Sequence, residues 1–305
     1  MEKKMLVEEH IASNKRKTIV VCGLMALLFI AVVFAFGYVF IGNIYISLAF
    51  ALPIAFAYIA ITYSTSVQQI LSAAKAKPAN PHIREQKLLI NRVEEMSIAS
   101  GLPMPKVYVQ ESPYINAFAT GKDPEHSVVC VTTGALKKLN QEELTGVIAH
   151  EMSHIKNYDI RLMTITIGVV GAIALMSNIL FYSMFWGGAG RSRGGGRGNE
   201  GQIILIVVAI LLIILAPIFS RLTYLAISRR REYLADSTGA YMSRNPEGLA
   251  KALEKIKDDS VKEKPVGSKT VAPLYISNPF KRQASGSAWS THPPLEERIK
   301  RLRSM

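Results

Sequence analysis

The sequence contains very few cysteines, because only Cys22 and Cys130 occur among its 305 residues. Cys22 lies in an apolar block and Cys130 in a polar region, so a disulfide framework is excluded and a reducing compartment is expected for the polar part. The sequence also lacks zinc-finger spacing, a helix-turn-helix pattern and aromatic residues interleaved with basic ones. Its formal net charge of +13 therefore indicates anionic lipid or a topology signal, and no nucleic-acid partner is expected.

Long apolar stretches occur four times in the chain, and the only charged residue in them is Arg221, near the end of the fourth. With 49% hydrophobic and 19% charged residues, the two kinds must be segregated, and the apolar blocks cover 18–36, 38–63, about 162–186 and about 203–227. Each block provides the roughly 20 residues that a helix needs to cross a bilayer, whereas runs of about 10–14 residues are typical of buried helices in soluble proteins. The sequence therefore predicts about four transmembrane helices, with the lipid bilayer as a partner.

Basic residues indicate how these helices are oriented. Five of them precede the first block (Lys3, Lys4, Lys15, Arg16 and Lys17), and the turn between the first two blocks has none. The positive-inside rule then places the N-terminus and the residues from about 64 onward in the cytoplasm. The Gly-rich loop 187–202 contains three arginines and would be external, against the same rule. A re-entrant second hairpin is the alternative that this loop leaves open.

The polar regions show the periodicities of helices and strands. We predict a linker over 78–81, a helix over 84–100 that ends at Gly101, strands over 106–110 and 127–133, and a short edge strand over 115–120. Further helices are predicted through Glu232 and Asp236, from Asn245 to about 257, and over 294–304. The composition of 258–290 predicts a mobile loop.

These features divide the chain into five parts. They are a basic N-terminus (1–17), a membrane hairpin (18–63), a catalytic part (64–161), a second membrane hairpin (162–227) and a C-terminal part (228–305).

His150 and His154 lie four residues apart on a helix predicted to start at the Asn140–Glu143 capping box and to reach about 156. This spacing places both imidazoles on one side of the helix, where they can share one metal ion. Glu151 lies between them, near the ion, in the position of a general base. A chance match on a surface helix is the alternative, but two of the six histidines of the chain fall in this motif.

A catalytic zinc ion needs three protein ligands and one open position. No histidine follows His154 within six residues, so the third ligand lies elsewhere, and Glu232 is the best candidate. Asp236, one turn later, is spaced to hold a ligand histidine in one tautomer. The alternative for Glu232 is a solvated carboxylate paired with neighbouring arginines. As a ligand, Glu232 must lie on the same side of the membrane as His150, and two crossings between them satisfy this.

Four segments together resemble the HtpX-type membrane peptidases, gluzincin zinc proteases related to the CAAX prenyl endopeptidases. They are Asn116–Gly121, the His150–His154 motif with Asn157 and Asp159, Glu232–Asp236 and Ser290–Pro294. The resemblance covers nearly the whole chain. It implies a mainly α membrane protein, multi-pass in the cell (inner) membrane, with about four transmembrane helices and a cytoplasmic α+β zincin-like catalytic domain.

The same resemblance implies roles for individual residues. One Zn²⁺ per subunit would be held by His150, His154 and Glu232, with Asp236 supporting a ligand histidine. The segment Asn116, Ala117, Phe118 and Ala119 would pair with an extended substrate by strand addition. Asn157 and Asp159 would support the active-site helix. His292 is either an oxyanion stabiliser or a loop histidine before a Pro-capped helix.

The resulting hypothesis is a membrane-bound zinc endopeptidase that cleaves misfolded or damaged membrane proteins and associated proteins, in quality control under stress. One alternative is a CAAX-type prenyl-protein endopeptidase, and another is a non-catalytic zinc-binding membrane adaptor or carrier. A carrier would need polar ligands inside the membrane, and the blocks 18–36 and 38–63 contain no His, Asp or Glu.

Overall fold

The structure is a computed structural model that describes residues 43–165, 167, 229–259, 266–278 and 293–305, with single positions between 12 and 41. The expectations for most of the first apolar block, for the second hairpin beyond 167 with its Arg-containing loop, and for His292 fall outside these residues. The chain divides into two compact units. One comprises Met1–Lys15, Val67–Thr164 and Thr223–Met305, and the other comprises Arg16–Ser66 and Ile165–Leu222.

Helix α2, Ile44–Ala74, contains most of the second apolar block. Asn43 precedes it, and the Asn43 side chain accepts a hydrogen bond from the backbone N–H of Tyr45 at 2.9 Å. Among the described residues, α2 is the one helix long and apolar enough to cross a membrane, and only 18% of its most apolar window is buried. Pro53 lies inside the helix, as is tolerated in membrane helices.

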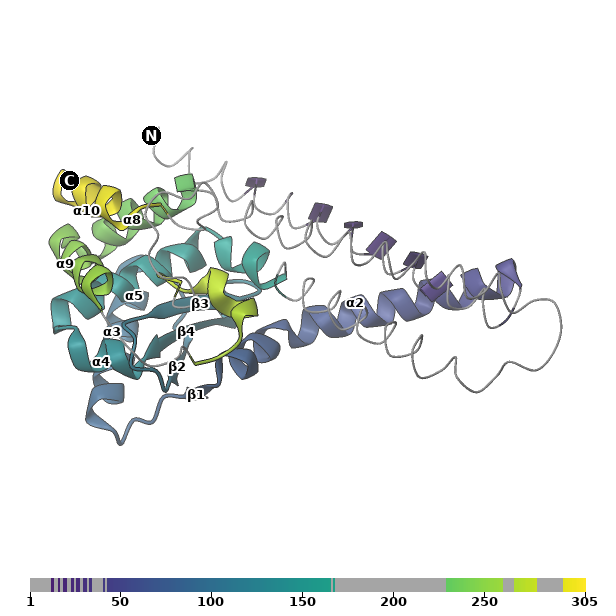
Figure 1. Ribbon diagram of the computed structural model, residues 1–305, viewed down its shortest axis with the longest axis horizontal. Coiled ribbons are helices and arrows are strands. Elements are labelled where there is room, and N and C mark those ends of the chain that lie inside the picture. Colours follow the sequence, from purple (N-terminus) through teal and green to yellow (C-terminus); the bar gives the residue numbers. More distant parts are fainter. Residues whose placement is uncertain are drawn as a thin grey trace. The chain divides into compact units, whose positions relative to one another are not determined.

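A four-stranded sheet lies in the first unit, in the order β1-β2-β4-β3 (Figure 1). Its strands are β1 (Ala76–Pro78), β2 (Lys106–Gln110), β3 (Ala117–Gly121) and β4 (Ser127–Thr132). Strands β2 and β4 are parallel, and the other two pairs are antiparallel. The prediction for 106–110 is confirmed, and that for 127–133 is one residue too long. Strand β3 is an edge strand, as expected, but it begins two residues later than 115.

The predicted linker over 78–81 overlaps a strand that the sequence did not reveal. Strand β1 includes Pro78 and pairs with β2 at the other edge of the sheet. Proline is tolerated there because an edge strand leaves one row of its backbone groups unpaired. A strand of three residues is too short to show periodicity, which explains the error.

The helices of this unit are α3 (Arg84–Ser100), α4 (Thr133–Lys138), α5 (Gln141–Lys156), α8 (Arg229–Ser243), α9 (Pro246–Asp258) and α10 (Leu295–Arg303). Two short 3₁₀ helices, η1 (Pro124–His126) and η2 (Lys269–Leu274), complete the described elements. Helix α3 ends as predicted, because Gly101 adopts the left-handed conformation with φ of 68°. The core lies between the sheet and the helices α3 and α5, and continues between α5 and the helices α8 and α9. Val129, Ile148 and Leu253 in it are fully buried.

The expectation of a mobile loop over 258–290 is wrong for 266–278. Val271, Leu274, Tyr275 and Ile276 in this stretch are each at most 5% exposed. The Lys, Ser, Pro and Gly residues around them lower the average hydropathy, so composition alone hid a buried apolar cluster.

Candidate metal centre

Helix α5 holds the His-Glu motif, and its start is determined locally. The Asn140 side chain accepts from the Glu143 N–H at 2.9 Å, and the Glu143 side chain accepts from the Asn140 N–H at 2.8 Å. These two bonds form the predicted capping box. The helix then continues to Lys156, so His150 and His154 lie on consecutive turns of one buried face.

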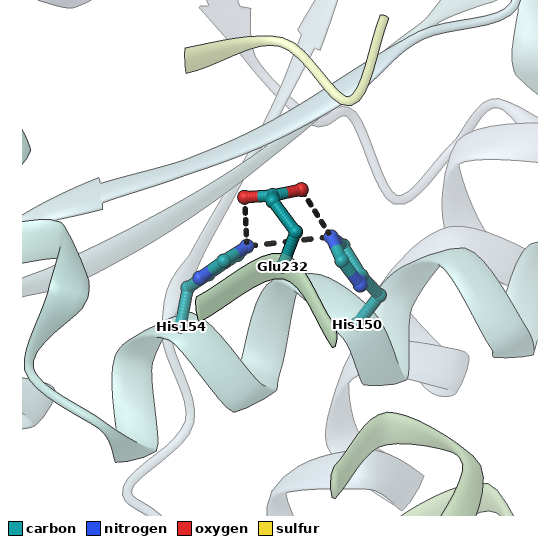
Figure 2. A group of neighbouring side chains, drawn as sticks. All are labelled: His150, His154 and Glu232. Carbon is teal, nitrogen blue, oxygen red and sulfur yellow. Dashed lines mark hydrogen bonds and ion pairs between the residues drawn. The ribbon is translucent and has the colours of Figure 1, made fainter. Parts of the chain in front are cut away.

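The imidazoles of His150 and His154 converge with the carboxylate of Glu232 (Figure 2). The two Nε2 atoms are 3.3 Å apart. Glu232 Oε2 lies 3.9 Å from His150 Nε2, and Oε1 lies 3.7 Å from His154 Nε2. All three side chains are buried, and one potential ligand atom from each lies within 4.8 Å of the others. The structure thus brings together the three residues proposed from sequence, and Glu232 is not a solvated carboxylate.

Glu232 reaches the histidines because α8 crosses α5 at very short range. A Cβ atom at Gly239 would lie 2.9 Å from the backbone N of His150, closer than packed atoms allow. Glycine is therefore required at this crossing, since any side chain would push the two helices apart. Sequence reasoning did not single out this residue.

Each histidine of the cluster also contacts a carboxylate through its other ring nitrogen. Asp236 Oδ1 lies 3.0 Å from His150 Nδ1, and Asp159 Oδ2 lies 3.1 Å from His154 Nδ1. Such contacts hold the proton on Nδ1 and direct the Nε2 lone pair toward the centre. Asn157, also singled out from sequence, is buried and ends α5 as its C-cap residue.

Arg298 was missed by sequence reasoning and is fully buried beside this cluster. It lies on α10 and donates to both carboxylate oxygens of Asp236, from Nη2 at 2.7 Å and from Nε at 2.9 Å. Its Nη1 atom is 3.7 Å from Glu232 Oε2. The sequence signal that could have identified Arg298 is its helical spacing, because it shares the apolar helix face of Leu295 and Leu302.

Burial and neighbouring charges alter the proton affinities of the site. Burial raises the pKa of Glu151, and this outweighs the opposing effect of the two imidazoles and of the hydrogen bond from the Ala119 N–H. Burial alone would lower the pKa of His154, but the bond to Asp159 and the charge of Glu232 raise it to about 9. The surroundings of His154 thus favour positive charge at this point.

The donor set fits a divalent metal ion. Two imidazoles and one carboxylate are the ligand types of catalytic zinc sites. Among the described residues, the cluster and its immediate surroundings contain four buried carboxylates (Glu151, Asp159, Glu232 and Asp236) and two buried guanidinium groups (Arg231 and Arg298). With neutral imidazoles, four negative and two positive groups leave a formal charge of −2, which a divalent cation would neutralise.

The predicted substrate strand runs beside the cluster. Strand β3 is buried along its whole length, and the Asn116 amide before it bonds to the backbone of Ser277. Ala119 directs its N–H to Glu151, so β3 passes the general-base candidate.

Comparisons with known proteins decide the class to which this site belongs. Residues 84–305 match Peptidase family M48. The chain belongs to this family. The family supports a metallopeptidase and implies a metal ion, for which the His150, His154 and Glu232 cluster is suited.

Full-length relatives carry the same classification. A "Protease HtpX homolog" of Thermoanaerobacter pseudethanolicus is 46% identical over 100% of this chain and 99% of the relative. The homolog of Caldanaerobacter subterraneus subsp. tengcongensis has the same identity and coverage, and that of Ligilactobacillus salivarius is 40% identical over 98% of this chain and 100% of the relative. The chain is thus an HtpX-type membrane-bound metalloprotease. Among solved structures, Ste24p of S. mikatae is similar with a TM-score of 0.43 and 20% identity, over 80% of this chain and 57% of that one.

Proposed function

We propose that this M48 metalloprotease is a zinc endopeptidase in which His150, His154 and Glu232 hold the ion and Glu151 is the general base. The observation that carries this assignment is the convergence of the three buried side chains within 4.8 Å, with Glu151 between the two histidines on α5. Two neutral imidazoles and one carboxylate leave room for a fourth, exchangeable position.

The chemistry divides between the ion and the protein. When bound, zinc lowers the pKa of water to about 7 and polarises the peptide carbonyl. Glu151 accepts the proton of the attacking water and delivers it to the leaving amine. The backbone N–H of Ala119 on β3 is directed toward the Glu151 carboxylate. His292 remains a predicted oxyanion stabiliser.

The remaining polar residues position the ligands. Asp236 and Asp159 hold the two histidines through Nδ1, and Arg298 holds Asp236 in turn. Asn157 is the C-cap residue of α5 and supports the end of this helix. Asp159, which contacts His154, follows two residues later. Asp236, Asp159 and Arg298 contact the ligand residues directly, so we assign them as positioning residues.

The proposed substrates are unfolded or damaged membrane proteins. An extended polypeptide would add to the free edge of β3 near Ala119, since main-chain pairing accepts many sequences. Helix α2 supports attachment to the bilayer. We further propose that the hairpin over 162–227 returns Glu232 to the side of His150, which the basic N-terminus assigns to the cytoplasm.

Zinc-dependent cleavage of unfolded casein by the purified, detergent-solubilised protein tests this proposal. Glu151→Gln should bind zinc with wild-type stoichiometry and lose at least roughly 10²-fold in activity, because proton transfer is lost. Glu142→Gln, on an exposed position of the same helix, is the matched control and should retain activity.

Three outcomes would overturn parts of the proposal. Full activity of Glu151→Gln would remove the general-base assignment. Full activity after chelation and dialysis would remove the metal. Cleavage restricted to prenylated C-terminal peptides would replace quality control with the CAAX-type activity.

A further inference from the structure

The free edge of β3 presents the backbone groups of alternate residues. Asn116 faces β4, because its C=O accepts from the Thr132 N–H at 3.0 Å. In an antiparallel pair the orientation alternates along the strand, so Ala117, Ala119 and Gly121 direct their N–H and C=O groups away from the sheet. These three residues are the positions at which a peptide could add as a further strand.

Two of the three positions already have partners from the chain itself. The Ala117 C=O accepts from the Ile276 N–H at 3.0 Å, and the Gly121 N–H donates to Thr164 Oγ1 at 3.1 Å. Ala119 lies between them, with its N–H directed to Glu151. Within the described part of the chain, no group donates a hydrogen bond to its carbonyl oxygen.

The segment Val271–Asn278, here called the strap, covers the Ala117 end of the edge through the Ile276 N–H, and its first residues belong to η2, which contacts β3 (Figure 1). Asn116 extends this contact, since its Nδ2 donates to the Ser277 C=O at 2.7 Å and its Oδ1 accepts from the Ser277 N–H at 3.4 Å. The Asn116 side chain therefore pairs with the strap as a backbone amide would. A substrate strand cannot use these groups while the strap is in place.

The strap is anchored by buried side chains. Tyr275 is 1% exposed, and its ring packs edge-on against Phe118 with 5.4 Å between centroids. Its hydroxyl donates to Gln110 Oε1 at 3.1 Å. Ile276 belongs to the main hydrophobic core. Lifting the strap would expose both side chains, which makes it a fixed wall and not a lid.

We propose that the strap closes the substrate edge of β3 at Ala117, so that a bound polypeptide can pair with β3 from Ala119 onward but not at Ala117, and must turn away at Ile276. This specificity role rests on the proposed peptidase function. It predicts that substrates need to be extended over only a short stretch beside the metal centre. The preferred substrates are then locally unfolded segments and loops, with no requirement for a long extended strand.

A backbone-ester scan tests the wall with the full-length, zinc-loaded enzyme in detergent. The probe is a fluorogenic peptide that the enzyme cleaves at one mapped bond, and each N–H near that bond except the scissile one is replaced in turn by an ester oxygen. Loss of one hydrogen bond should lower kcat/KM by about twofold to tenfold. We expect sensitivity at the N–H that meets the Ala119 carbonyl, and none at the N–H two residues from it on the Ala117 side.

A sensitive position two residues from this one on the Ala117 side would show that substrate displaces the strap, and would overturn the proposal. No sensitive position would overturn it as well, because the substrate would then not pair with β3. Failure of the peptidase proposal is distinguishable, since the unmodified peptide would then be cleaved equally by Glu151→Gln or not at all.

A matched pair of variants tests the anchor. Tyr275→Ala removes the ring against Phe118 and should release the edge, so that the scan gains a sensitive position on the Ala117 side. Tyr275→Phe keeps the ring and loses only the bond to Gln110, so it should give the wild-type pattern. A wild-type pattern in a folded Tyr275→Ala protein would overturn the strap as the element that closes the edge. If that variant does not fold, the wild-type scan decides alone.

Discussion

Replacing Arg298 with methionine would leave the carboxylate of Asp236 buried without its two charged hydrogen bonds. Methionine is similar in length and remains apolar on the core-facing side of α10, so the main loss is the ion pair at 2.7 and 2.9 Å. Breaking a buried pair by removing one partner costs about 3–5 kcal/mol. At 2–4 °C per kcal/mol, the midpoint of thermal unfolding should fall by roughly 6–20 °C.

The same substitution should weaken metal binding through His150. Asp236 lies 3.0 Å from His150 Nδ1, and without Arg298 it loses the group that holds it in place. Loss of such outer contacts typically lowers metal affinity by about 10–100-fold. Competition with a chromophoric zinc chelator measures this affinity, and differential scanning fluorimetry measures the unfolding midpoint.

The double variant Asp236→Asn with Arg298→Met separates the two effects. It removes both charges, so it should recover most of the lost stability while zinc affinity stays low. Unchanged stability in Arg298→Met would refute the ion pair as a significant interaction. A double variant no more stable than Arg298→Met would refute the buried-charge reasoning.

Two further substitutions test the positioning of the ligands. Gly239→Ala should destabilise the protein by about 1–3 kcal/mol and weaken zinc binding, because the new Cβ atom would meet the His150 backbone and displace Glu232. Thr238→Ala on the same helix is the control, and equal thermal stability of the two variants would contradict the close crossing. Asp159→Asn should lower zinc affinity by roughly 10–100-fold at an unchanged circular dichroism spectrum, since the charged partner of His154 is lost. Wild-type affinity in a zinc competition assay would disprove the role of Asp159 in positioning His154.

Local features of the chain were readable from sequence because their causes are local. The capping box at Asn140 and the glycine at Gly101 define helix ends through contacts within a few residues. The four-residue spacing of His150 and His154 follows from helix geometry alone. Even Glu232 was accessible, because the zinc ligand count requires a third donor outside the motif.

Long-range contacts were less accessible. Arg298 lies 62 residues after Asp236 and reads as one more basic residue on a basic helix until α10 packs against α8. Tyr275 and Ile276 lie in a segment whose composition predicts a loop, and only their packing against Phe118 and the core reveals the strap.

The sequence by itself determined the chemistry of this protein, since residue types, helical spacing and apolar block lengths depend on neighbours along the chain. The tertiary structure alone decided how that chemistry is arranged. Gly239 sets the approach of α8 to α5, Arg298 completes the charge around the ligands, and the strap limits the free edge of β3. Each of these depends on residues far apart in sequence whose meeting only the packed fold determines.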